Sequence, residues 1–147
     1  MKKIIVVSIA LLLSGCVTQV DKFSYLKQWN DSWQACDRQG KTSTLTFPAS
    51  PWFNALARED KIAVLIYLNE LKDYQCTEGE ALRLKAVLAD ADITTLNDLL
   101  KGFIYFEAPD KEAIQHLDQS QVEALAKAID GPFNPLKVAE DLGMLQP

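Results

Sequence analysis

Apolar residues recur at steps of three and four along most of this chain, which is the spacing that places side chains on one face of an α-helix. The first such face is formed by Leu26, Trp29, Trp33 and Cys36. Similar faces follow over Ala81–Ala91, Leu96–Phe106 and Val122–Ile129. Because helices of this kind bury their apolar faces against one another, we expect an all-α domain built as a small bundle of five or six short helices.

Capping signals place several helix ends. Ser50 is a good N-cap, and Pro51 is a favourable first helical residue. The helix that begins there is expected to continue, with a break near Arg58, as far as Tyr74. Its centre, Ile62–Leu68, is apolar almost all round, which is typical of the buried middle of a bundle.

Further signals divide the second half of the chain. Thr77–Glu80 and Ser120–Glu123 both fit capping boxes, so each is expected to begin a helix. A short helical turn is expected over Asp110–His116, capped by the aspartate. Gly131-Pro132 is expected to end the helix that begins at Ser120. A last helix is expected over Asn134–Leu142.

One segment does not follow the helical spacing. From Lys41 to Phe47, threonines alternate with Ser43, Leu45 and Phe47. Alternation of this kind is a strand signal, but the chain offers no partner strand and prolines follow directly. Two interpretations stay open: an extended linker, or a short strand whose edge pairs with another protein.

The chain begins with a short basic and apolar segment. Lys2 and Lys3 precede an apolar run, Ile4–Leu13, that only Ser8 interrupts. A basic start followed by such a run is the layout of a secretory signal peptide. The run is about half of the roughly 20 residues that a membrane-spanning helix needs.

This segment ends Leu13-Ser14-Gly15-Cys16, a pattern that resembles the lipobox of bacterial lipoproteins. The resemblance implies cleavage before Cys16, a diacylglycerol on its thiol and an acyl group on its new amino terminus. More than one acyl chain gives stable membrane attachment. Val17, where an aspartate would favour retention in the inner membrane, implies sorting to the outer membrane. No other cofactor is expected.

The expected organisation is a signal peptide over residues 1–15, a short lipidated tether over residues 16–22 and a single helical domain over residues 23–147. Such a tether keeps the domain close to the membrane. We expect the domain to lie on the periplasmic face of that membrane. Because the removed segment carries Lys2 and Lys3 and no acidic residue, the net charge of −5 for the whole chain becomes −7 for the mature chain. An acidic chain without a basic cluster argues against nucleic-acid binding.

Two cysteines follow the lipidated one. Cys36 and Cys76 form an even pair in a chain that is expected to be exported, which predicts a disulfide. A zinc site is disfavoured because His116 is the only histidine. The sequence contains no CxxC redox motif.

No set of residues in the sequence is typical of a catalytic site. The closest carboxylates, Glu59-Asp60, Glu78/Glu80 and Asp90/Asp92, stand at expected helix ends, where they favour the helix dipole. His116 lies in no GxSxG context, and the cysteines after Cys16 are expected to be oxidised. Without a nucleophile, a base and an orienting group, an enzyme is not expected, and no catalytic or metal-binding residue is assigned.

Aromatic residues gather in the first third of the chain. Trp29 and Trp33 stand at helical spacing and are expected in the core. Trp52 and Phe53 are neighbours, so their side chains point in different directions and one of them can be exposed. Because aromatic residues are frequent anchors at interfaces, these two are the candidate contacts for a partner.

These features predict a membrane-tethered binding or assembly module for another envelope protein. Pilotins, which escort secretin subunits to the outer membrane, are similar in size and architecture, although no pilotin residue motif is present. One alternative is a protective or immunity lipoprotein whose acidic surface binds a periplasmic toxin. Another is a small envelope enzyme with an unrecognised site.

Overall fold

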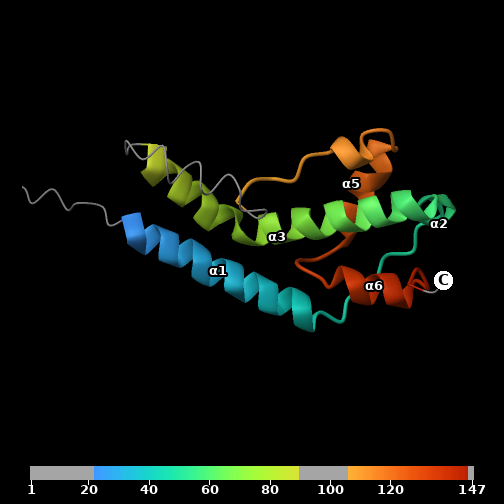
Figure 1. Cartoon of the computed structure of the whole chain (residues 1–147), viewed down its shortest axis with the longest axis horizontal. Helices are drawn as coiled ribbons and strands as arrows, with labels where there is room; N and C mark the ends of the chain where they lie inside the picture. The colour runs from blue at the N-terminus through green and yellow to red at the C-terminus, as the bar shows by residue number, and fades with distance from the viewer. Residues whose placement is uncertain (1–21, 90–105, 146–147) are drawn as a thin grey trace, which may run out of the picture.

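The computed structural model describes residues 22–89 and 106–145, and within these ranges the secondary structure is helical with no strand. The elements are α1 (Lys22–Thr42), α2 (Pro51–Ala55), α3 (Arg58–Ala89), the 3₁₀ helix η1 (Glu112–Ile114), α5 (Gln119–Ala128) and α6 (Pro135–Asp141). The all-α prediction is confirmed. α1 packs along the second half of α3, while α2, α5 and α6 gather around its first half (Figure 1).

α3 is the spine of the molecule, and it is longer than the sequence indicates. It runs without interruption from Arg58 to Ala89, so the helix start predicted at Thr77 is wrong. The Thr77 side chain is buried, and its hydroxyl donates to the backbone oxygens of Asp73 at 3.4 Å and Tyr74 at 3.3 Å. A hydroxyl that bonds back into the preceding turn suits a helix interior, whereas an N-cap needs an extended backbone.

The larger core surrounds the first half of α3. Val64, Leu65 and Leu68 are at most 3 % exposed. They pack against buried side chains from the surrounding elements: Phe53, Ile114, Val122, Leu125, Ile129, Phe133 and Val138. Elements far apart in the sequence therefore share this one apolar interior, which fixes η1 against α3.

The segment between α1 and α2 is extended and pairs with no strand among the described residues. Leu45 and Phe47 pack against the larger core, and Thr44 and Thr46 are exposed. The rings of Phe47 and Phe53 lie 4.8 Å apart. Within the chain this segment is a linker, and the alternation reflects one side facing the core; pairing of its edge with another protein stays a prediction.

A second, smaller core joins α1 to the other half of α3. Trp29 packs with Ala81, Leu84, Leu88 and Phe106. The rings of Trp29 and Phe106 meet edge to face, with centroids 5.4 Å apart. Most of the predicted apolar face over Leu96–Phe106 lies outside the described residues, but its last member is buried here.

The predicted disulfide is present and ties these two helices together. The sulfur atoms of Cys36 in α1 and Cys76 in α3 are 2.07 Å apart, with Cα atoms at 6.1 Å. It closes a loop of 40 residues that contains the linker, α2 and the first part of α3. Because no α1 side chain belongs to the larger core, the disulfide supplements the smaller core in holding α1.

Apart from Thr77, helix ends follow the capping signals with one further exception. The Ser50 hydroxyl accepts a hydrogen bond from the Phe53 N–H at 3.2 Å, and the Asn134 side chain accepts from the N–H of Leu136 at 3.0 Å. The start predicted at Ser120 is wrong, because Asp118 is the N-cap of α5. Its carboxylate accepts from the Ser120 N–H at 2.9 Å and the Ser120 hydroxyl at 2.6 Å, and these hydrogen bonds lower the pKa of Asp118.

Candidate functional site

A groove lies between α3 and the segment that carries η1. It has a volume of about 270 Å³. The residues that line it come from one face of α3 and from around η1: Glu59, Ile62, Ala63, Ile66, Tyr67, Glu70, Asp110, Ala113 and Ile114. We call this feature the α3–η1 groove.

The floor of the α3–η1 groove is apolar and open to solvent. Ile62 is 42 % exposed and Ile66 is 50 % exposed. The prediction that the Ile62–Leu68 stretch is buried all round is therefore wrong on this side. α5, α6 and η1 cover the rest of the stretch, but no described element covers the face that carries these two isoleucines.

Carboxylates surround this floor. Glu59 and Glu70 stand on α3, and Asp110 stands on the opposite side, just before η1. The Asp110 carboxylate accepts a hydrogen bond from the Glu112 N–H at 2.9 Å, which fixes the short turn predicted there. Burial, and to a smaller degree the charge of Asp110, raises the pKa of Glu70.

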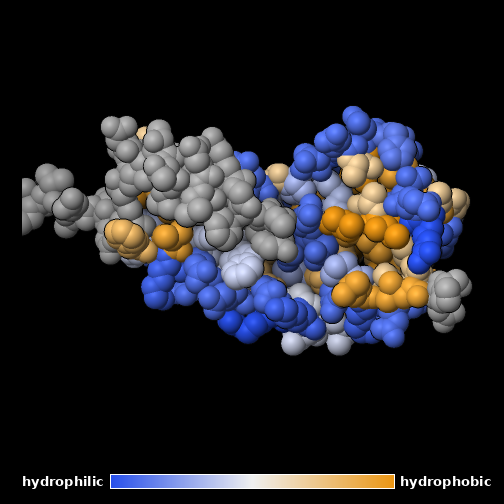
Figure 2. Space-filling view, viewed as in Figure 1, coloured by the Kyte–Doolittle hydropathy of each residue, from blue (hydrophilic) through white to orange (hydrophobic). Residues whose placement is uncertain are grey.

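Further apolar surface lies beside the groove. α6 runs antiparallel to the first half of α3, because the Asn69 amide donates to the Phe133 oxygen at 2.9 Å and the Arg58 guanidinium donates to the Met144 oxygen at 3.0 Å. Leu136 on α6 is exposed. Figure 2 shows hydrophobic surface over the first half of α3 and over α6 on the same face of the molecule.

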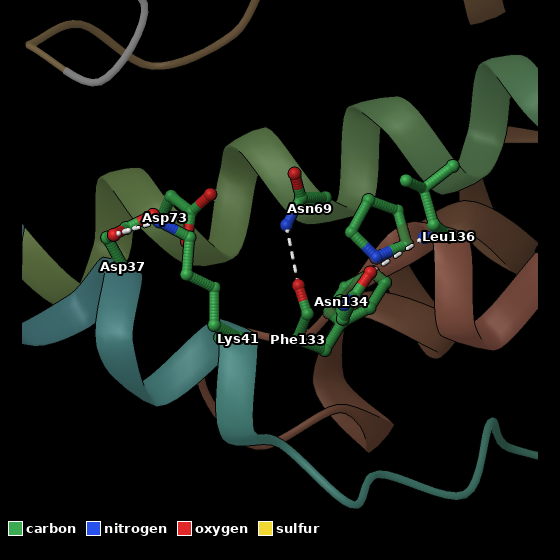
Figure 3. Close-up of a pocket in the computed structure, with 9 residues that line it drawn as sticks. Asp37, Lys41, Asn69, Asp73, Phe133, Asn134 and Leu136 are labelled. Atoms are coloured by element: carbon green, nitrogen blue, oxygen red, sulfur yellow. Dashed lines mark hydrogen bonds and ion pairs between the residues drawn. The ribbon is translucent and has the colours of Figure 1, made fainter.

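A second cleft, of about 280 Å³, lies where α1, α3 and the start of α6 meet (Figure 3). The Lys41 ammonium lies 2.8 Å from a carboxylate oxygen of Asp37. Burial raises the pKa of Asp73 to about 6, and the neighbouring charges of Asp37 and Glu70 add to the effect. The residues lining this cleft include no serine, cysteine or histidine, so we assign Asp73 no catalytic role.

His116 forms a pair that the sequence does not reveal. Its Nε2 atom lies 2.9 Å from a carboxylate oxygen of Asp60 on α3, and the His116 side chain is 57 % exposed. A carboxylate can orient an imidazole for catalysis, but such a dyad also needs an activated nucleophile. In the described part of the chain the cysteine thiols are joined in the disulfide. The same part holds no group of three or more side chains suited to a metal ion.

The two candidate partner contacts do not form an exposed pair. Phe53 is 1 % exposed and belongs to the larger core, while Trp52 is half-buried against that core. Phe53 lies on the side of α2 that packs against the larger core. A partner therefore cannot reach Phe53 in this structure. Cys16 lies outside the described residues.

No protein-family model matches the chain, and neither a curated protein nor a solved structure shows significant similarity to it. Among the helices of residues 22–89 and 106–145, none combines the length and the apolarity needed to cross a membrane.

Proposed function

We propose that this protein is a lipid-anchored, non-enzymatic docking module of the bacterial outer membrane that holds another envelope protein in the α3–η1 groove. The observation that carries the proposal is the pair of exposed isoleucines, Ile62 and Ile66, on the floor of that groove. The lipobox resemblance at Leu13–Cys16 supplies the membrane address. The short tether would hold the start of α1 near the membrane, and the elements that form the groove lie toward the other end of the molecule (Figure 1).

A partner that covers the floor of the groove gains binding free energy from the two isoleucines. A fully buried isoleucine side chain is worth roughly 1.5–3 kcal/mol relative to an exposed one. Ile62 and Ile66 are about half exposed, so covering both contributes on the order of 2 kcal/mol. Their positions on the rigid spine helix lower the entropy lost when a partner binds.

The test is co-purification of envelope proteins from detergent-solubilised membranes with wild-type protein and with Ile66→Asp. We expect this substitution to remove the captured protein while leaving helicity and melting temperature nearly unchanged, because the side chain is half exposed. Leu82→Asp is the matched control: Leu82 is an equally exposed apolar residue on the same helix, 54 % exposed and outside the groove.

Capture that survives Ile66→Asp contradicts the docking proposal. The identity of a captured protein separates two versions of it: a component of an envelope machine supports an assembly role, and a toxin supports the protective role. His116→Ala addresses the enzyme alternative, since the docking proposal expects this variant to keep both fold and capture.

A further inference from the structure

We infer that the α3–η1 groove binds an amphipathic segment of a partner protein that carries basic side chains toward both of its ends. This inference rests on the proposed docking function and specifies the chemistry of the partner. An apolar stripe of the segment would cover Ile62 and Ile66, and its cations would meet Glu59, Glu70 and Asp110.

The placement of the three carboxylates carries the inference. Glu59 and Glu70 are eleven residues apart on α3, which corresponds to about 16 Å at 1.5 Å per residue. The two exposed isoleucines lie between them, and Asp110 faces them across the groove. The apolar floor is thus bounded by negative charge at both ends and on its far side.

These charges are not neutralised by the described part of the molecule. None of the three carboxylates forms an ion pair with another described residue. Two cations next to them in the sequence have other contacts: Lys111 lies 3.9 Å from a carboxylate oxygen of Glu123, and Arg58 donates to the Met144 oxygen. The raised pKa of Glu70 agrees with uncompensated negative charge in a partly buried setting.

Other occupants are disfavoured by the same charges. A second copy of this chain in a two-fold arrangement would place carboxylates against carboxylates. An anionic membrane surface would be repelled. Residues 90–105 of this chain contain three aspartates and one lysine, so they would add negative charge to the groove. A basic segment of another protein is the occupant that charge complementarity favours.

The test measures peptide binding to the purified full-length mature protein by fluorescence anisotropy. The probe is a labelled 15-residue helical peptide with leucines on one face and lysines near both ends. One comparison peptide has the lysines replaced by glutamates, and another has the same composition with the leucines scattered around the helix. We expect only the first peptide to bind, with affinity that falls as salt rises.

A triple variant, Glu59→Gln, Glu70→Gln and Asp110→Asn, removes the charges and keeps the groove. We expect it to bind the basic peptide about tenfold more weakly, since each partly exposed ion pair is worth about 0.5 kcal/mol. The matched control neutralises three carboxylates that do not line the groove, Asp31→Asn, Glu78→Gln and Glu140→Gln. It should bind like the wild type.

Three results would overturn the inference: no binding of the basic peptide, equal binding of the scattered or glutamate peptides, or unchanged affinity of the triple variant. The docking function fails separately. If Ile66→Asp abolishes capture of an envelope protein while the triple variant retains it, docking stands and the basic partner is wrong. If Ile66→Asp retains capture, the docking function itself is wrong.

Discussion

Asp73 lies beside the disulfide, in a small hollow that it shares with Trp33, Cys36 and Asp37. Burial, with a smaller contribution from the charges of Asp37 and Glu70, raises the pKa of this carboxyl. Since the pKa of Asp73 is raised from 3.8 to about 6, the folded state binds this proton more tightly than the unfolded state does. Asp73 therefore destabilises the fold when it is ionised.

We predict that Asp73→Asn stabilises the protein near pH 7.5 and has little effect near pH 4. With respect to this group, stability is highest below the unfolded pKa of 3.8, falls as the pH rises toward 6 and then stays low. A shift of this size corresponds to about 3 kcal/mol, which solvent screening reduces to about 1–2 kcal/mol. Denaturant unfolding at both pH values measures it, and an equal gain at both would contradict the assignment.

At the scale of single residues, the sequence predicts what depends on near neighbours. The caps at Ser50 and Asn134 follow from two or three adjacent residues. The disulfide follows from the even number of cysteines after Cys16. Whether Trp52 or Phe53 faces inward depends on where α2 meets the larger core, which no local pattern contains. Asp118 was missed because Ser120 offers a competing cap only two residues away.

At the scale of elements, α3 shows why a local start signal can mislead. The sequence Thr77-Glu78-Gly79-Glu80 is compatible with a helix start and also with a helix interior. Packing decides between them: Ala81, Leu84 and Leu88 continue into the smaller core, and the disulfide at Cys76 holds the same helix against α1. The continuous helix buries these side chains in the smaller core and Val64, Leu65 and Leu68 in the larger core.

We predict that Gly79→Ala stabilises the protein by about 0.5–1 kcal/mol, because glycine weakens a helix interior. A Cβ atom at Gly79 would meet nothing within 4 Å, and the residue has no positive φ. Gly143→Ala is the matched comparison: its Cβ atom would also meet nothing, but its φ is +69°, so that substitution should destabilise. Thermal unfolding measures both, and a loss of stability in Gly79→Ala would argue against a continuous α3.

The groove also belongs to the scale of elements, and a signal for it is visible in the sequence. Glu59, Ile62, Ala63, Ile66 and Glu70 stand at spacings that share one helical face, with carboxylates at each end of an apolar stretch. Hydrophobicity alone predicted that this stretch is buried. Its exposure depends on which helices reach it, and that arrangement involves residues some fifty positions away in the chain.

At the scale of the whole molecule, the anchor proposed at Cys16 would determine where the groove can act. We predict that Cys16→Ser prevents lipidation and moves the protein out of the membrane fraction, because the lipobox resemblance makes the Cys16 thiol the site of acylation. Membrane fractionation with carbonate washing and mass analysis of the amino-terminal peptide measure the change. A Cys16→Ser protein that resists washing would contradict the lipobox interpretation.

The described residues form two cores, and the disulfide joins the two helices that form the smaller one. α1 contributes to the smaller core through Trp29, Tyr25 and Leu26, while the larger core and the α3–η1 groove use other elements. Closing a loop of 40 residues restricts the unfolded chain, so losing the cross-link costs about 2–5 kcal/mol in small exported domains. Because the disulfide and the smaller core hold α1, whereas other elements form the larger core, we expect the loss of stability to appear first in α1.

We therefore predict that Cys36→Ser with Cys76→Ser lowers the free energy of unfolding by about 2–5 kcal/mol and that amide exchange rises first in α1. Amides of α3 between Val64 and Leu68 should keep their protection longest, because the side chains of Val64, Leu65 and Leu68 are buried in the larger core. Hydrogen exchange under native conditions measures the order. Uniform loss of protection in α1 and in the first half of α3 would show instead that the two cores unfold as one unit.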